Sequence, residues 1–203
     1  RSRRDEMKKS LFLFWATIGF VYFAGTIGVH AASRYQLDVV HSTVGFAVKH
    51  MLFSTVRGKF NDVRATAEID EQTGSLSSVN AEISVASVDT DNAKRDGHLR
   101  SDDFFNAERY PTITFKSTSI APGANGNYRV DGILTIRDVS KPITLEGKLL
   151  GKMPGRVAFE AAGQINRQDF NVTWNKALQS AGGLMVSDEV DLNIEVALYV
   201  PEG

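Results

Sequence analysis

Residues 190–200 read VDLNIEVALYV, and this stretch decides the fold class. Apolar residues occupy every second position from Val190 to Val200, while Asp191, Asn193 and Glu195 fall between them. A period of two places successive side chains on opposite faces of an extended chain. The stretch therefore predicts a β-strand with one apolar face and one polar face.

The same alternation recurs along the chain and predicts eight strands. Within residues 56–70 the inward positions are even-numbered up to Phe60 and odd-numbered from Val63 onward, and this change predicts a β-bulge near 61–62. The links between the strands are short and rich in Gly, Pro, Asn and Ser, which favours antiparallel neighbours. The expected strands lie near residues 42–50, 56–70, 77–88, 112–120, 127–138, 141–151, 157–167 and 187–200.

Eight long strands with one apolar face each must stack as two sheets or close into one barrel. Glycines at inward positions favour strong curvature. We therefore predict an all-β, eight-stranded antiparallel lipocalin-like barrel, with a β-sandwich as the alternative. The inward glycines are Gly58, Gly132, Gly147 and Gly163.

Two segments break the alternation. Residues 93–106 carry His98, Asp102 and Phe105 at helical spacing, which predicts one short helix capped by Thr90 or Asp91. Residues 167–185 include Trp174 and a glycine pair, and they predict a long loop with one helical turn. Long segments at the mouth of a barrel are usual places for lids and binding loops.

Residues 1–31 differ in character from the rest of the chain. Lys8 and Lys9 precede an uncharged run over 11–29, and small residues follow up to Ala31. This order is typical of a secretory signal peptide; an uncleaved membrane anchor is the alternative, because roughly 20 apolar residues span a bilayer. We expect a leader over 1–31 and one domain over 32–203, placed in the periplasm or secreted.

Composition and motifs exclude several function classes. The chain has no Cys, which excludes thiolate metal sites and a cysteine nucleophile. Residues 1–31 hold five of the 23 Lys+Arg and two of the 24 Asp+Glu, so the remainder carries a net charge of −4. A mildly acidic domain has no basic stripe for nucleic acid. Because nucleophile-elbow, zinc-protease, phosphate-loop and dinucleotide motifs are also absent, we expect a binding protein and not an enzyme.

Three histidines lie outside the leader. The odd separation of His41 and His50 places them on opposite strand faces, which argues against a shared metal. His50 has the parity of Phe46, so we expect it inside, either as a core residue or as a polar contact for a ligand head group. His98 lies beside the acidic pair 102–103, where a solvated helix face is favoured over a metal site.

The interior of the predicted barrel allows two interpretations. An eight-stranded barrel is either filled by side chains or holds one small ligand. The inward positions mix Phe and Leu with many Gly and Ala. The small residues either leave room for a lipid-like ligand or merely relieve crowding in a tilted barrel.

Four strings together resemble the YceI family of secreted lipid-binding proteins. They are YQLDVVHSTVGFAVKHM (35–51), RDGHLRSDDFF (95–105), LTIRDVSKPI (134–143) and INRQDF (165–170). The resemblance covers residues 35–200 and implies a barrel with a helix near one end, whose pore holds a polyisoprenoid or similar amphiphile. It implies no catalytic residues. One departure is Asn171, where the family often has Gly.

The resemblance also implies binding residues. Pocket or mouth candidates are Phe46, Val48, His50, Phe60, Phe104, Phe105, Phe115 and Phe170. Candidates for the head-group end are Asn166, Arg167 and Trp174.

These observations define the expected ligand and partners. We expect a polyisoprenoid, an isoprenoid quinone or a precursor as the bound lipid, with a role in transport or storage. No other cofactor, no metal, no nucleic acid and no stable membrane insertion after signal cleavage are expected, and a homodimer is left open. The alternatives are an enzyme acting on such a lipid, with His50 or His98 as base, and a ligand-free structural partner of a membrane complex.

Overall fold

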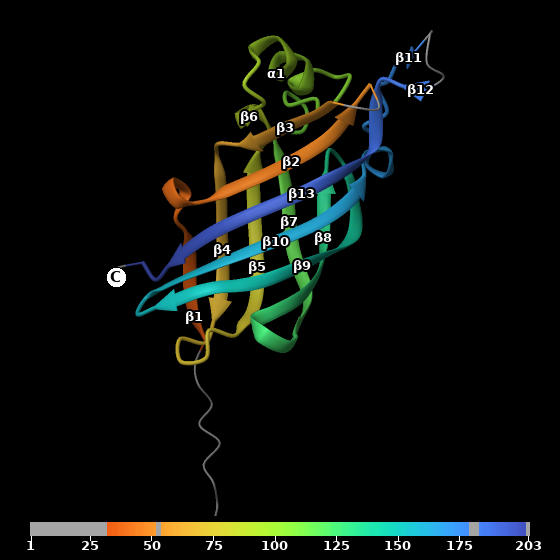
Figure 1. Cartoon of the computed structure of the whole chain (residues 1–203). Helices are drawn as coiled ribbons and strands as arrows, with labels where there is room; N and C mark the ends of the chain where they lie inside the picture. Colours follow the sequence, from red (N-terminus) through yellow and green to blue (C-terminus); the bar gives the residue numbers. More distant parts are fainter. Residues whose placement is uncertain (1–31, 52–53, 179–182, 202–203) are drawn as a thin grey trace, which may run out of the picture.

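Antiparallel strands wrap around one axis in the computed structural model, and a short helix lies at one end (Figure 1). The structure describes residues 32–51, 54–178 and 183–201, so the predicted leader lies outside the described residues. The helix is α1 (Ala93–Arg100). The strands are β1 (Ser33–Leu37), β2 (Thr43–His50), β3 (Ser54–Phe60), β4 (Val63–Ile69), β5 (Leu76–Ser84), β6 (Val88–Asp89), β7 (Thr112–Pro122), β8 (Asn127–Ile136), β9 (Val139–Met153), β10 (Arg156–Asn166), β11 (Ala177–Leu178), β12 (Gly183–Leu184) and β13 (Val186–Tyr199).

The sheet closes on itself through β1. Its order is β1-β4-β5-β7-β8-β9-β10-β13-β2-β3-β6, and β1 pairs with β13 as well as with β4. In the closing ladder Gln36 lies opposite Tyr199 and Leu37 opposite Leu198. The sheet has eleven strands, but β1 with β2, β3 with β4 and β5 with β6 are successive parts of three bent strands. The barrel wall therefore consists of eight continuous strands, which we call staves. The predicted eight-stranded antiparallel barrel is confirmed, and the sandwich alternative is wrong.

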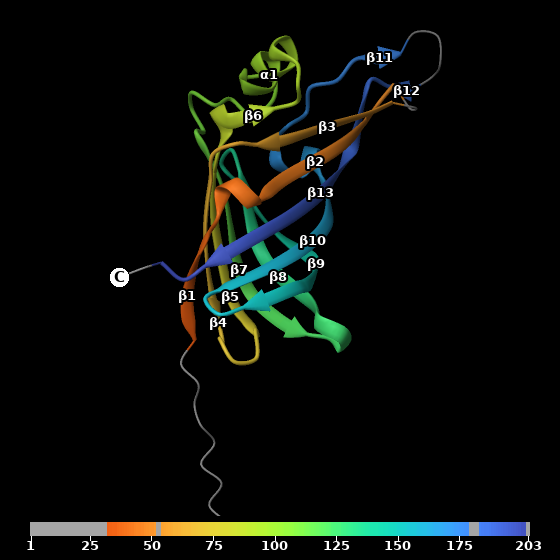
Figure 2. The ribbon, with the colours of Figure 1, turned by 60° about the vertical axis from the view of Figure 1, so that its left-hand side comes forward.

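The staves are not equally inclined. β4, β5 and β7 run near the vertical in Figure 1, while β2, β13 and β10 cross them obliquely, and the view turned by 60° again shows β2 and β13 crossing β4 and β5 (Figure 2). In both views β2, β3 and β13 extend beyond the body of the barrel towards β11 and β12. The β11–β12 pair lies within the segment predicted as a loop, and the predicted helical turn is the 3-10 turn Arg167–Phe170.

The stretch 56–70 is two strands and not one strand with a bulge. β3 pairs with β2, whereas β4 pairs with β1 and β5. Between them, Asn61 N–H donates to Ser87 O and Asp62 O accepts from Ser84 N–H, so residues 61–62 form a corner of the barrel. The inward-facing apolar residues do change from even to odd positions here, but the cause is a sharp bend, at which the chain leaves the ladder with β2 and enters the ladders with β1 and β5.

The helix begins at Ala93 as predicted, but it is shorter and has a different N-cap residue. Asn92 is its N-cap, since its side chain accepts a hydrogen bond from Arg95 N–H. Asp91 has φ +58°, in the left-handed region, and does not cap the helix. At the other end Ser101 is extended and its hydroxyl donates to His98 O, which ends the helix six residues earlier than the spacing predicted.

Inward glycines serve two purposes. A Cβ on Gly132 would lie 2.4 Å from the Phe115 ring, and one on Gly58 would lie 2.4 Å from the Phe46 ring. At these positions the glycine makes room for an aromatic ring from the neighbouring strand. Gly147, by contrast, makes ordinary contacts and lines an interior cavity. Gly58 and Gly132 therefore relieve crowding between strands, whereas Gly147 borders open space inside the barrel.

Substituting Gly132 with Ala should lower the free energy of unfolding by about 1–3 kcal/mol. The added methyl group would clash with the Phe115 ring and would lie 2.8 Å from Lys116 O, a backbone atom that cannot rotate away. Urea unfolding monitored by circular dichroism measures the change.

Gly97→Ala is the matched control, because this exposed helix position has no atom within 4 Å of the added methyl group. It should raise stability by up to about 1 kcal/mol. Equal stability changes in the two variants would contradict the role assigned to the Gly132 site.

Candidate ligand cavity inside the barrel

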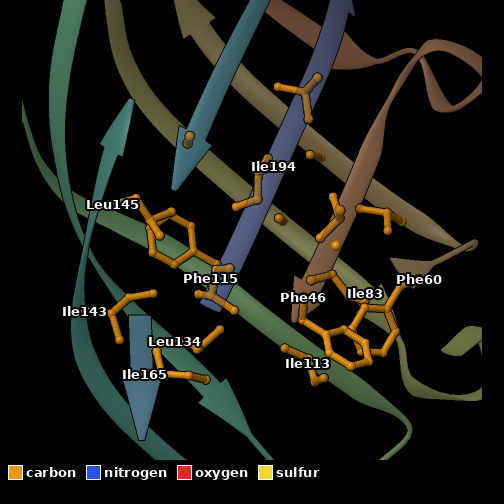
Figure 3. Close-up of a pocket in the computed structure, with 18 of the residues that line it drawn as sticks. Phe46, Phe60, Ile83, Ile113, Phe115, Leu134, Ile143, Leu145, Ile165 and Ile194 are labelled. Carbon is orange, nitrogen blue, oxygen red and sulfur yellow. The ribbon is translucent and has the colours of Figure 1, made fainter. Parts of the chain in front are cut away.

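An elongated cavity of about 250 Å³ lies inside the barrel. Its walls are aliphatic and aromatic side chains from nearly every stave, and they point towards one another across the interior (Figure 3). Arg167 is the one cationic residue among the lining residues that the structure describes. Labelled lining residues in Figure 3 are Phe46, Phe60, Ile83, Ile113, Phe115, Leu134, Ile143, Leu145, Ile165 and Ile194.

β2 and β13 form a loosely packed part of the cavity wall. Inward residues of β8 and β10, such as Leu134 and Phe159, are buried. Inward residues of β2 and β13, such as Phe46 and Leu192, are only partly buried although the ladder turns them inside. Their remaining exposed surface faces the cavity and its mouth. The apolar face that the sequence predicts for 190–200 therefore lines the cavity, and it also packs against the core, where Leu198 is buried.

Three aromatic rings lie in a row near the helix end. The ring centroids of Phe46 and Phe60 are 5.7 Å apart, and those of Phe60 and Phe105 are 6.0 Å apart. Phe105 belongs to the turn after α1, whereas the other two rings come from the barrel wall. This row joins the cap of the barrel to its wall at a lining surface of the cavity.

A second aromatic cluster joins the two segments that cover the helix end. The His98 ring lies edge-on to Phe104 at 4.9 Å and to Trp174 at 4.8 Å, and Phe104 and Trp174 are 5.2 Å apart. His98 Nε2 also lies 2.8 Å from Asp103 Oδ2. His98 thus packs against two aromatic rings, while its side chain stays 39% exposed and those of Asp103 and Asp102 are 53% and 85% exposed, so the acidic side of this segment is solvated as expected.

Arg167 ties the loop that follows β10 to the start of β13. Its Nη2 donates to Asp188 Oδ1 at 2.8 Å and its Nε donates to Ser187 O at 2.9 Å. Its Nη1 donates to Val172 O and Trp174 O. Burial lowers the pKa of this guanidinium and Asp188 raises it, and the group stays protonated near neutral pH. One buried cation thus supplies the donors that a non-repetitive loop needs.

Asn171 takes up the conformation that the loop requires. Its φ is +59°, in the left-handed region where Gly is most at ease and Asn is tolerated. Its carbonyl accepts a hydrogen bond from Arg137 Nη1 at 2.8 Å. Asn in place of Gly is therefore compatible with the loop over 170–174.

Among residues 32–51, 54–178 and 183–201, no group of three His, Asp or Glu is close enough to hold a metal ion. Within the same residues no helix is long and apolar enough to cross a membrane.

A family model described as a YceI-like domain matches residues 35–198. This chain belongs to the YceI-like family. Protein YceI of Escherichia coli O157:H7 is 38% identical over 198 residues, which cover 94% of this chain and 97% of that protein. The crystal structure of a Campylobacter jejuni YceI protein has a TM-score of 0.67 at 35% identity, over 82% of this chain and 97% of that one.

A structure from Saccharophagus degradans, described as a polyisoprenoid binding domain, has a TM-score of 0.64. The match covers 82% of this chain and 98% of that one at 18% identity, so it shows a common fold. The resemblance inferred from the four sequence strings is confirmed by the family model and by the YceI relatives.

The YceI-like barrel brings most of the predicted site residues to one cavity. Those that line it are Phe46, Val48, Phe60, Phe104, Phe105, Phe115 and Arg167. Four predicted residues lie elsewhere. His50 pairs with Ser54 and Val186 at the far end of β2, and Asn166 caps the 3-10 turn by accepting from Gln168 N–H.

The other two predicted residues pack behind the side chains that line the cavity. Phe170 is 1% exposed and packs in the core. Trp174 lies against Phe104 and His98 and does not appear among the lining residues. Sequence reasoning did not single out Tyr128 or Leu99, both of which line the cavity. Tyr128 lies two residues before Val130 in the same predicted strand, and this spacing could have indicated that its side chain points inward. No sequence pattern indicated the same for Leu99, which lies in the helical segment.

Arg167→Met should lower the free energy of unfolding by about 3 kcal/mol, because it removes the Arg167 donor from three backbone carbonyls and leaves the Asp188 carboxylate with Gln168 but without its cation. Chemical denaturation of purified protein measures the loss.

Arg129→Met is the control. Arg129 pairs with Asp131 at 3.0 Å on the exposed surface, and such a pair contributes at most about 1 kcal/mol. Similar losses in both variants would refute the structural role of Arg167 in this YceI-like barrel.

Proposed function

We propose that this YceI-like protein is a periplasmic or secreted binding protein for a long-chain amphiphile. The apolar chain lies in the barrel cavity, and the protein transports or stores the lipid. The observation that carries the proposal is the almost wholly apolar cavity inside a closed barrel. The expected ligand is a polyisoprenoid, an isoprenoid quinone or a precursor of one.

The chemistry of the walls favours a lipid chain over a polar metabolite. Each CH₂ group moved from water to an apolar site contributes about 0.8 kcal/mol. A polar ligand would lose its hydrogen bonds to water and would find few partners on these walls. The name of the Saccharophagus degradans domain motivates the choice of isoprenoids among lipids.

The position of Arg167 favours one orientation of the ligand. Arg167 lies at the helix end, where the loop after β10 meets β13. A polar head group is better placed at this end than among the aliphatic side chains farther down, because a buried polar group needs a partner. The head group of the lipid therefore lies at the helix end and its chain points into the barrel.

Binding is favoured over catalysis on the same lipid. His50 and His98 are the residues that an acid–base reaction would use, and neither lines the cavity. His98 is engaged with Asp103 and two aromatic rings. A general base must lie within hydrogen-bond reach of the proton that it removes.

The direct test is native mass spectrometry of the protein purified from bacteria without detergent, followed by solvent extraction. A lipid bound in one-to-one ratio supports the proposal and identifies the cargo. An apo mass that persists after incubation with isoprenoid alcohols, isoprenoid quinones and fatty acids refutes it and favours a protein partner instead.

Leu192→Asp should reduce the fraction of protein that retains lipid at least about tenfold, since an unpaired carboxylate in an apolar cavity disfavours a hydrocarbon chain. Leu192 lines the cavity and is partly exposed to it. Native mass spectrometry compares the bound fractions.

Asn193→Asp is the matched control, because the neighbouring side chain is exposed on the outer face of the same strand. It should retain lipid like the unmodified chain. Leu192→Trp fills the cavity without adding charge and should also lose lipid. Full retention in both Leu192 variants would show that the ligand does not occupy this cavity.

A further inference from the structure

The end of the barrel away from α1 is closed by side chains. β5 and β7 pair only over Asn80–Ser84 and Thr112–Lys116, and below this level the two strands part. At the point of parting, Val79 N–H donates to the Ser117 hydroxyl at 2.9 Å and not to a backbone carbonyl. The lower wall between these strands therefore has no backbone ladder and depends on side chains to exclude water.

Tyr128 bridges this gap. It projects inward from β8, is 7% exposed, and lines the cavity. Its hydroxyl donates to Gly74 O, at 3.3 Å, in the turn between β4 and β5. Its ring lies edge-on to Phe159 of β10, with 5.8 Å between centroids and 76° between planes. One side chain thus connects three separate parts of the barrel across its lower end.

The turn that Tyr128 contacts is held in place. The Asp70 carboxylate accepts hydrogen bonds from Gln72 N–H at 3.0 Å and Thr73 N–H at 2.7 Å. Lys152 Nζ donates to Gln72 O from β9, on the other side of the barrel. Gly74 is buried with φ +77°, a backbone conformation that suits Gly. This turn is therefore a fixed support for the Tyr128 hydroxyl.

The interior around Tyr128 is closely packed, although Leu76 and Leu198 at this level still line the cavity. Tyr35, Ile69 and Val157 are at most 4% exposed and belong to the core, and they are not among the lining residues. This packing places the lower end of the cavity near Tyr128 and Phe159, and we take its mouth to lie at the helix end, where loop segments and not strands cover the barrel. Its volume of about 250 Å³ lies just below the usual range for ligand pockets, roughly 300–1,000 Å³, so its length is limited.

We infer that Tyr128 is the floor of the cavity and determines how long an apolar chain the barrel accepts. The inference rests on the proposed function and deepens it by naming the residue that sets ligand length. A chain entering from the mouth gains about fourfold in affinity for each CH₂ that it buries, until its end reaches the Tyr128 ring. Carbon atoms beyond that length stay outside the cavity and add nothing to the affinity.

The test compares farnesol, geranylgeraniol and solanesol, three all-trans isoprenoid alcohols of increasing length. Competition binding of these alcohols to the full chain is measured by native mass spectrometry, for the unmodified protein and for Tyr128→Ala. The ratio of solanesol to farnesol affinity should rise at least about tenfold in Tyr128→Ala, because removing the ring opens the lower end to more of the longer chain.

Tyr128→Phe is the matched control, since it keeps the ring and removes only the hydrogen bond to Gly74. It should show the chain-length profile of the unmodified protein. Tyr128→Leu is a second variant that keeps an apolar side chain and should shift the profile in the same direction as Tyr128→Ala, by a smaller factor. Circular dichroism checks that each variant is folded.

Three results would overturn the inference. An unchanged solanesol-to-farnesol ratio in folded Tyr128→Ala or Tyr128→Leu protein would show that the floor lies elsewhere. An equal shift in Tyr128→Phe would assign the limit to the hydrogen bond and not to the ring. Binding of none of the three alcohols by the unmodified protein would overturn the proposed function as well, and is thereby distinguished from a failure of the floor alone.

Discussion

Closure of the ladder between β1 and β13 is the constraint on which the rest of the structure depends. A sheet with one apolar face must cover that face, and it must leave no unpaired edge of hydrogen-bonding groups. Pairing Gln36 with Tyr199 and Leu37 with Leu198 meets both needs at once, because the apolar face becomes an interior. The cavity, its mouth and its floor are consequences of this enclosure.

Within the enclosure, paired small and large residues decide where space remains. The Phe115 and Phe46 rings occupy the room that Gly132 and Gly58 leave, so these glycines give curvature without leaving a void. The cavity is lined from nearly every strand, and the inward side chains of β2 and β13 are among those that stay only partly buried.

The two ends of the barrel are closed by different means. At the helix end, non-repetitive segments meet through aromatic contacts around His98 and through the donors of Arg167. At the other end, a hairpin turn is fixed by the Asp70 carboxylate and is bridged by Tyr128. An end held by loops that enter from outside the barrel is better suited to ligand entry than an end held by the strands themselves. The orientation proposed for the lipid follows from this difference.

Periodicity in the sequence was enough to predict eight antiparallel staves and their inward faces, because a period of two is a local property of each strand. The barrel was favoured by the inward glycines, and β1 (Ser33–Leu37), which closes it, lay outside the predicted strands. Periodicity also placed Phe46, Phe60 and Phe115 inside. The corner at 61–62 was visible only as a change of parity, since bulge and bend have the same local pattern. Only the tertiary structure decided that Arg167 is bound to the loop and β13, that Trp174 lies behind Phe104, and that Tyr128 reaches Gly74. These contacts join residues far apart in the chain, and closure of the barrel, which no local pattern encodes, brings them together.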